Sequence, residues 1–89
     1  MIERTITIIN NLGLHARAAA KFVTTASEFE ADIKVSRNGR TVNGKSIMGM
    51  MMLAAAKNTE IVITADGIDE NKVLEAIEAL INDYFGEGE

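Results

Sequence analysis

The segment from Gly13 to Ala18 contains the single histidine of this chain. His15 lies where an alternating, strand-like pattern gives way to a helical one, so the sequence places it at a helix N-terminus. Free backbone N–H groups and the positive end of the helix dipole meet there, which favours a neutral imidazole and binds anions. Arg17 adds a planar guanidinium that suits phosphate oxygens. These residue types and their spacing predict a histidine that carries a phosphoryl group.

Two local rules of helix formation are broken in this segment. Histidine at an N-cap forgoes about 1 kcal/mol relative to Ser, Thr, Asp or Asn. A cation such as Arg17 in the first turn opposes the helix dipole. Both choices become favourable once an anion binds, and local rules are most often broken where function requires it. We expect the phosphoryl group to bind the guanidinium and the first-turn amides of the helix, namely those of Ala16, Arg17 and Ala18.

Composition limits the classes of protein to consider. The 89 residues, 47% of them hydrophobic and 25% charged, predict one domain over residues 1–89 with a small core. A net charge of −4 disfavours nucleic acid as a partner. With no cysteine and one histidine, we expect no disulfide, no metal site and no cofactor. Neither a signal peptide nor a membrane-length apolar stretch is present, so a cytoplasmic protein without membrane insertion is expected.

Hydrophobic periodicity predicts seven elements in the order β-α-β-β-α-β-α. Asn38-Gly39 is a strong hairpin signal, because both positions of the tight turn need positive φ. Strands are expected over residues 2–9, 31–35, 40–43 and 60–65, and helices over residues 16–27, 46–53 and 70–85. Four strands with one clear hairpin predict an α+β fold in which a four-stranded antiparallel sheet carries the helices on one face.

The last predicted helix has its own start and stop signals. Asp69 is placed at its N-cap, and Ile68 with Val73 is expected to form a hydrophobic staple. Tyr84 falls on the apolar face of this helix by its spacing. Residues 86–89 are expected to fray.

A second candidate site begins at Ser46, the predicted N-cap of the middle helix. The run over residues 47–53 contains more apolar side chains than one short helix can bury. Met50 and Leu53 are assigned to the core. Three of the remaining apolar residues are predicted to form an adaptable docking surface, rimmed by two lysines. They are Ile47, Met48 and Met51, with Lys21 and Lys45 at the rim.

Both segments together resemble the phosphocarrier protein HPr of the bacterial phosphoenolpyruvate-dependent phosphotransferase system. The segment Gly13-Leu14-His15-Ala16-Arg17 is similar to the family's active-site segment, and Lys45-Ser46-Ile47-Met48-Gly49 to its regulatory segment. The resemblance spans essentially the whole chain. It implies an open-faced β-sandwich with three helices. It also implies that His15 accepts a phosphoryl group on Nδ1 from enzyme I and donates it to the A component of sugar permeases.

The resemblance implies further properties. It implies that Ser46 is the position phosphorylated by an HPr kinase/phosphorylase in some bacteria, and that the methionine-rich surface is the docking site for donor and acceptor. The chain is expected to act as a monomer and as a stoichiometric carrier rather than a turnover enzyme. Ala18 stands where the family usually has proline. Alanine favours the helix but leaves one more first-turn N–H free, and we expect no loss of carrier activity from that difference.

Three alternatives compete with this interpretation. A nitrogen-branch regulatory carrier that acts by protein binding is favoured somewhat by Asn11-Leu12-Gly13, whereas Lys45-Ser46-Ile47-Met48-Gly49 favours the sugar-type carrier. A nucleic-acid-binding α+β domain is disfavoured by the acidic charge and by only four aromatic residues. Residues 39–46 match the P-loop pattern, but a predicted hairpin and strand occupy the place of the phosphate loop.

Overall fold

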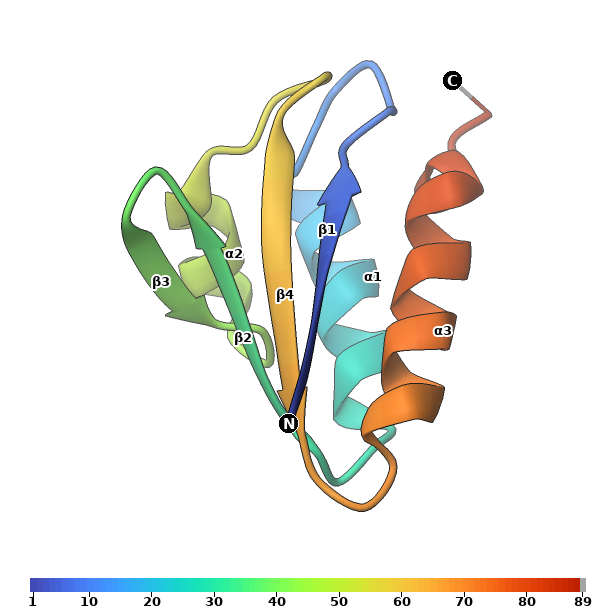
Figure 1. The fold of residues 1–89 in the computed structure, drawn as a ribbon. Helices are drawn as coiled ribbons and strands as arrows, with labels where there is room; N and C mark the ends of the chain where they lie inside the picture. The colour runs from blue at the N-terminus through green and yellow to red at the C-terminus, as the bar shows by residue number, and fades with distance from the viewer. Residues whose placement is uncertain (89) are drawn as a thin grey trace.

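Residues 1–88 are described by a computed structural model of the chain (Figure 1). The predicted β-α-β-β-α-β-α order is confirmed, with a short 3₁₀ turn added at the end. The strands are β1 (Ile2–Thr7), β2 (Asp32–Arg37), β3 (Arg40–Asn43) and β4 (Glu60–Asp66). The helices are α1 (Ala16–Ser27), α2 (Ile47–Leu53) and α3 (Glu70–Asn82), followed by the 3₁₀ turn η1 (Tyr84–Gly86).

The four strands form one antiparallel sheet in the order β1-β4-β2-β3. Alternation along each strand sets the two faces: Ile6 and Ile61 are paired and buried, while Thr5, next to Ile6 along β1, is exposed. All three helices lie against one face of the sheet, and the other face is bare of helices (Figure 1). This arrangement confirms the predicted α+β fold and the open-faced β-sandwich that the family resemblance implied.

The core fills the space between the sheet and the helices. The apolar stripe of α1 contributes Phe22, which is fully buried, and α2 contributes Met50 and Leu53 as predicted. Burying an aromatic or aliphatic side chain of this size stabilises the fold by about 1.5–3 kcal/mol. Of the helices within residues 1–88, none is both long and apolar enough to cross a membrane.

Two contacts show that α1 and α2 run in opposite directions. The backbone N–H of Leu14, just before α1, donates to the carbonyl of Ala55, just after α2, at 2.9 Å. At the other end, Lys45 Nζ, just before α2, donates to the carbonyl of Phe29, just after α1, at 2.8 Å. The C-terminus of α2 therefore lies beside the start of α1, and its N-terminus lies toward the far end.

The last helix ends earlier than predicted. It stops at Asn82 rather than at residue 85, because Tyr84 and Phe85 both adopt left-handed backbone conformations, with φ of 56° and 54°. This turn buries Phe85 completely and leaves Tyr84 exposed, the reverse of the helical pattern. Burial of the Phe85 ring contributes about 1.5–3 kcal/mol, which offsets much of the left-handed strain, about 2–4 kcal/mol over the two residues.

The start of α3 also differs from the sequence-based expectation. Asp69 occupies the N-cap position as predicted, but its carboxylate makes no capping bond to α3. It accepts instead from the backbone N–H groups of Glu30 at 2.8 Å and Ala31 at 2.9 Å. Ile68 is 92% exposed, so the predicted hydrophobic staple with Val73 was wrong.

Candidate functional site

The loop between β1 and α1 is pressed against the end of α2. Gly13 has φ of +65°, and a Cβ at this position would lie 2.5 Å from the carbonyl oxygen of Ala55. Only glycine tolerates both this backbone conformation and this close approach. The buried Asn10 side chain donates from Nδ2 to the Gly13 carbonyl at 2.9 Å. These contacts fix the position of the loop and hence of His15, which follows it.

His15 is the N-cap of α1, as predicted. Its Nδ1 accepts a hydrogen bond from the backbone N–H of Arg17 at 3.3 Å, so the ring supplies a cap in place of the usual hydroxyl or carboxylate. Its Nε2 faces the opposite way and pairs with Oε2 of Glu87. The side chain is 28% exposed, which leaves the ring accessible from solvent.

Glu87 belongs to the tail that the sequence predicted to fray, and that prediction was wrong for this residue. Its side chain is 11% exposed, and Oε1 accepts from Asn10 Nδ2 at 3.0 Å. Burial alone raises the pKa of the Glu87 carboxyl. Hydrogen bonds from Asn10 and His15, with the charges of His15 and Lys21, lower this pKa by more in total, so it lies below its ordinary value and the carboxylate is ionised near neutral pH. Residue 89 of the same tail lies outside the described residues.

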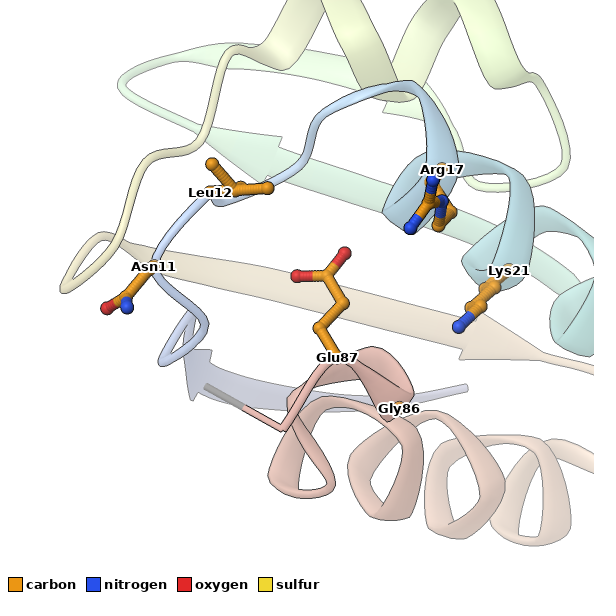
Figure 2. Close-up of a pocket in the computed structure, with 6 residues that line it drawn as sticks. All are labelled: Asn11, Leu12, Arg17, Lys21, Gly86 and Glu87. Carbon is orange, nitrogen blue, oxygen red and sulfur yellow. The ribbon is translucent and has the colours of Figure 1, made fainter.

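A pocket opens beside His15, between α1, the loop before it and the C-terminal segment (Figure 2). Figure 2 shows the Glu87 carboxylate projecting into this space, with Arg17 and Lys21 on α1 across from it. Arg17 is exposed and forms no ion pair with any other residue of the described part of the chain. The pocket is lined by Asn11, Leu12, Arg17, Lys21, Gly86 and Glu87.

The first turn of α1 begins directly after His15, and the phosphoryl-binding role of its amides stays a prediction. The amides of Ala16, Arg17 and Ala18 belong to the turn whose N–H groups have no intrahelical acceptor. Ala16 is exposed and Ala18 is completely buried. No three His, Cys, Asp or Glu side chains within residues 1–88 come together to bind a metal ion.

The three apolar residues predicted for docking, Ile47, Met48 and Met51, lie on α2 and are exposed. Met48 is the most exposed of them at 74%. Two further exposed apolar residues, Met52 on α2 and Leu12 on the loop before α1, were missed by the sequence interpretation. A pattern of helical spacing could not place Leu12 with this group, because it lies on a different segment. We define the methionine patch as the exposed residues of α2: Ile47, Met48, Met51 and Met52.

Ser46 and the two predicted rim lysines have defined partners. Ser46 is the N-cap of α2, as predicted, and its Oγ accepts from the Gly49 N–H at 3.1 Å. Lys45 Nζ is bound to the Phe29 carbonyl, and Lys21 Nζ donates to the Phe85 carbonyl at 2.6 Å. Lys21 therefore lies at the His15 pocket, whereas Lys45 and Ser46 lie toward the far end of α1. The site residues fall into two groups rather than one.

Fold and pocket together define a small open-faced sandwich protein with a histidine at a helix N-terminus beside two cations. Residues 2–83 match the family described as PTS HPr component phosphorylation site. The chain is 57% identical over 89 residues to the phosphocarrier protein HPr of Neisseria meningitidis serogroup A, with 100% of both chains covered.

Solved structures agree with this match. The crystal structure of HPr-C-His from Thermoanaerobacter tengcongensis has a TM-score of 0.94 and 46% identity, covering 98% of each chain. An HPr dimer from the same organism has a TM-score of 0.79, also at 46% identity, covering 98% of this chain and 100% of that chain. The chain belongs to the HPr family of phosphocarrier proteins of the phosphotransferase system. The nitrogen-branch alternative is not favoured by these relatives, which are named HPr.

Proposed function

We propose that His15 accepts a phosphoryl group on Nδ1 from phosphorylated enzyme I and passes it to the A component of sugar permeases. One observation carries this proposal: Nδ1 faces the N-terminus of α1, where it accepts the Arg17 N–H, while Nε2 is turned toward Glu87. A group attached to Nδ1 would meet free amides and the positive end of the helix dipole.

The transfer step follows from this geometry. The Nδ1 lone pair attacks the phosphorus, and the bond from phosphorus to the donor atom breaks with its electron pair returning to the donor. The Arg17 N–H then loses Nδ1 as its acceptor and donates to a phosphoryl oxygen instead. The amides of Ala16 and Ala18 and the Arg17 guanidinium stabilise the remaining negative charge. Transfer to the acceptor reverses these changes, so the carrier is regenerated without a cofactor or metal.

The methionine patch is the proposed docking surface for both the donor and the acceptor. Its C-terminal end adjoins the loop that holds His15, because the Leu14 N–H is bound to the Ala55 carbonyl. Exposed methionines adapt their shape to more than one partner. Lys21 adds positive charge next to the phosphoryl site, and Lys45 adds positive charge at the N-terminal end of α2, away from His15.

Ser46 is proposed as a regulatory phosphorylation site for an HPr kinase/phosphorylase. A phosphate on Ser46 would lie at the N-terminus of α2, and it would add nearly two negative charges to the end of the patch away from His15. Regulation would therefore act on partner docking rather than on the chemistry at His15. We expect Ser46→Asp to slow transfer from enzyme I about tenfold, with unchanged spontaneous hydrolysis of phosphorylated His15. Equal slowing by Ser46→Ala, measured in stopped-flow transfer assays, would assign the effect to the lost cap instead.

The proposed setting is a cytoplasmic, monomeric carrier with residues 1–89 acting as one domain. The solved dimer of a relative makes the oligomeric state a necessary control, and sedimentation velocity at assay concentrations measures it directly.

Labelling with phosphoenolpyruvate and enzyme I tests the proposed function. We expect one acid-labile phosphoryl group, located on His15 by mass spectrometry, and no labelling of His15→Ala. Labelling that survives this substitution would contradict the proposal. Offering sugar-type and nitrogen-branch A components to the labelled carrier then distinguishes the two branches.

A further inference from the structure

The C-terminal segment is built to hold Glu87 against His15. Phe85 is completely buried, and its carbonyl accepts from Lys21 Nζ at 2.6 Å. The N–H of Gly86 donates to the Asp83 carbonyl and that of Glu87 to the Tyr84 carbonyl, each at 2.9 Å. This succession of contacts turns the chain back over the start of α1. The position of Glu87 is therefore set by the fold of the segment.

Both oxygens of the Glu87 carboxylate face hydrogen-bond donors. Oε1 accepts from Asn10 Nδ2 at 3.0 Å, and Oε2 pairs with His15 Nε2. Asn10 is fully buried and is itself fixed by its bond to the Gly13 carbonyl. Arg17 and Lys21 line the same pocket, and the positive charge of Lys21 favours the ionised carboxylate.

These contacts determine where the imidazole proton lies. A carboxylate beside Nε2 requires a proton on that nitrogen, and the Arg17 N–H beside Nδ1 requires a lone pair there. The ring is thus held in the tautomer with Nδ1 unprotonated. A carboxylate that orients a histidine in this way also stabilises positive charge on the ring.

We propose that Glu87 is a positioning residue for phosphoryl transfer, which holds the proton on His15 Nε2 both before and after Nδ1 is phosphorylated. This inference rests on the proposed function of His15. When the Nδ1–P bond forms, a ring that keeps its Nε2 proton becomes positively charged, and the Glu87 carboxylate offsets that charge. When the bond breaks, the electron pair returns to Nδ1 and the proton remains on Nε2. No proton enters or leaves the site in either direction.

The protonation of Nε2 affects how readily the His15 ring leaves when the Nδ1–P bond breaks. A phosphorylated ring that loses its Nε2 proton becomes neutral and releases the phosphoryl group less readily. Without the carboxylate, this loss occurs at lower pH. Glu87 is therefore expected to extend phosphoryl transfer toward higher pH.

The Glu87→Gln variant tests this role. Glu75→Gln is the matched control, because Glu75 is exposed on α3 and its substitution removes the same negative charge. Glutamine presents one acceptor oxygen to two donors, so the pairing with Asn10 and His15 cannot be kept intact. Nitrogen-15 NMR of the His15 ring reports the tautomer, and stopped-flow transfer between pH values of about 6 and 9 reports the pH profile.

We expect Glu87→Gln to shift the high-pH limb of transfer down by about one pH unit and to lower the fraction of Nε2-protonated ring, while Glu75→Gln does neither. Glu87→Asp should partly restore both, because it returns the charge. If Glu87→Gln is still labelled on His15 and its tautomer and pH profile are unchanged, the inference about Glu87 is overturned and the proposed function stands. Absence of His15 labelling in the unaltered protein would instead overturn the proposed function.

Discussion

Gly13 sets the position of His15, because the absence of a side chain lets the loop before α1 pack directly against the Ala55 carbonyl. Its φ is +65°, and any side chain at this position would place its Cβ 2.5 Å from the Ala55 oxygen, so larger residues are excluded. We expect Gly13→Ala to lower the free energy of unfolding by about 2–3 kcal/mol, from strain of the positive φ and from displacement of the loop. Urea denaturation measures this change, and the phosphorylation rate of His15 should fall with it.

Gly39 offers a matched control for that prediction. It also has positive φ, at +80°, but a Cβ there meets nothing within 4 Å. Gly39→Ala should therefore cost about 1 kcal/mol from backbone strain alone and leave phosphorylation unchanged. Equal destabilisation by the two substitutions would show that the approach to Ala55 contributes nothing.

At the scale of elements, Asp69 ties the start of α3 to the chain between α1 and β2. The hydrogen bond from the Glu30 N–H lowers the pKa of Asp69, burial opposes it, and the Ala31 N–H lowers the pKa further. Because the folded-state pKa lies below the unfolded value, the contribution to stability is complete above the unfolded pKa. It disappears as the pH falls through the folded pKa.

Asp69→Asn tests this connection. The variant should be less stable than the unaltered protein at about pH 7, and the difference should shrink at about pH 3. Urea denaturation at both pH values measures it. A difference that stays constant with pH would mean that the ionised carboxylate is not what joins the two segments.

The sequence predicted the starts of helices better than their ends. His15 and Ser46 precede their helices as expected, since N-cap signals are local and come from one or two residues. The end of α3 depends on burying Phe85 against distant parts of the core, and no local pattern contains that information. The same limit applies to the predicted staple between Ile68 and Val73. The chain at the start of α3 is fixed by hydrogen bonds from Asp69 to residues about forty positions away, which no local pattern contains.

At the scale of the whole molecule, the residues of the candidate site also divide into those that local sequence patterns predict and those that only the fold brings together. His15, Arg17 and Ser46 could be found from sequence because each departs from or satisfies a local rule. Asn10 and Glu87 could not, because they lie 77 residues apart and meet only after the chain has folded. A glutamate between two glycines near the C-terminus has the composition of a mobile tail, and only the structure places it on the histidine.

The placement of all helices on one face has a consequence for how partners are used. His15 and the methionine patch both belong to the helical side of the sandwich. Donor and acceptor would therefore compete for one surface, and the carrier would have to leave one before meeting the other. Transfer rates should accordingly depend on the concentration of each partner and on ionic strength.

The bare face of the sheet is also of practical use. The chain contains no cysteine, and Thr5 projects from the middle of β1 on the side opposite the helices. A Thr5→Cys protein would accept a single fluorophore at a known position, away from the surface that partners are proposed to contact. Encounters with other proteins could then be followed in real time by anisotropy, without the dye itself altering them.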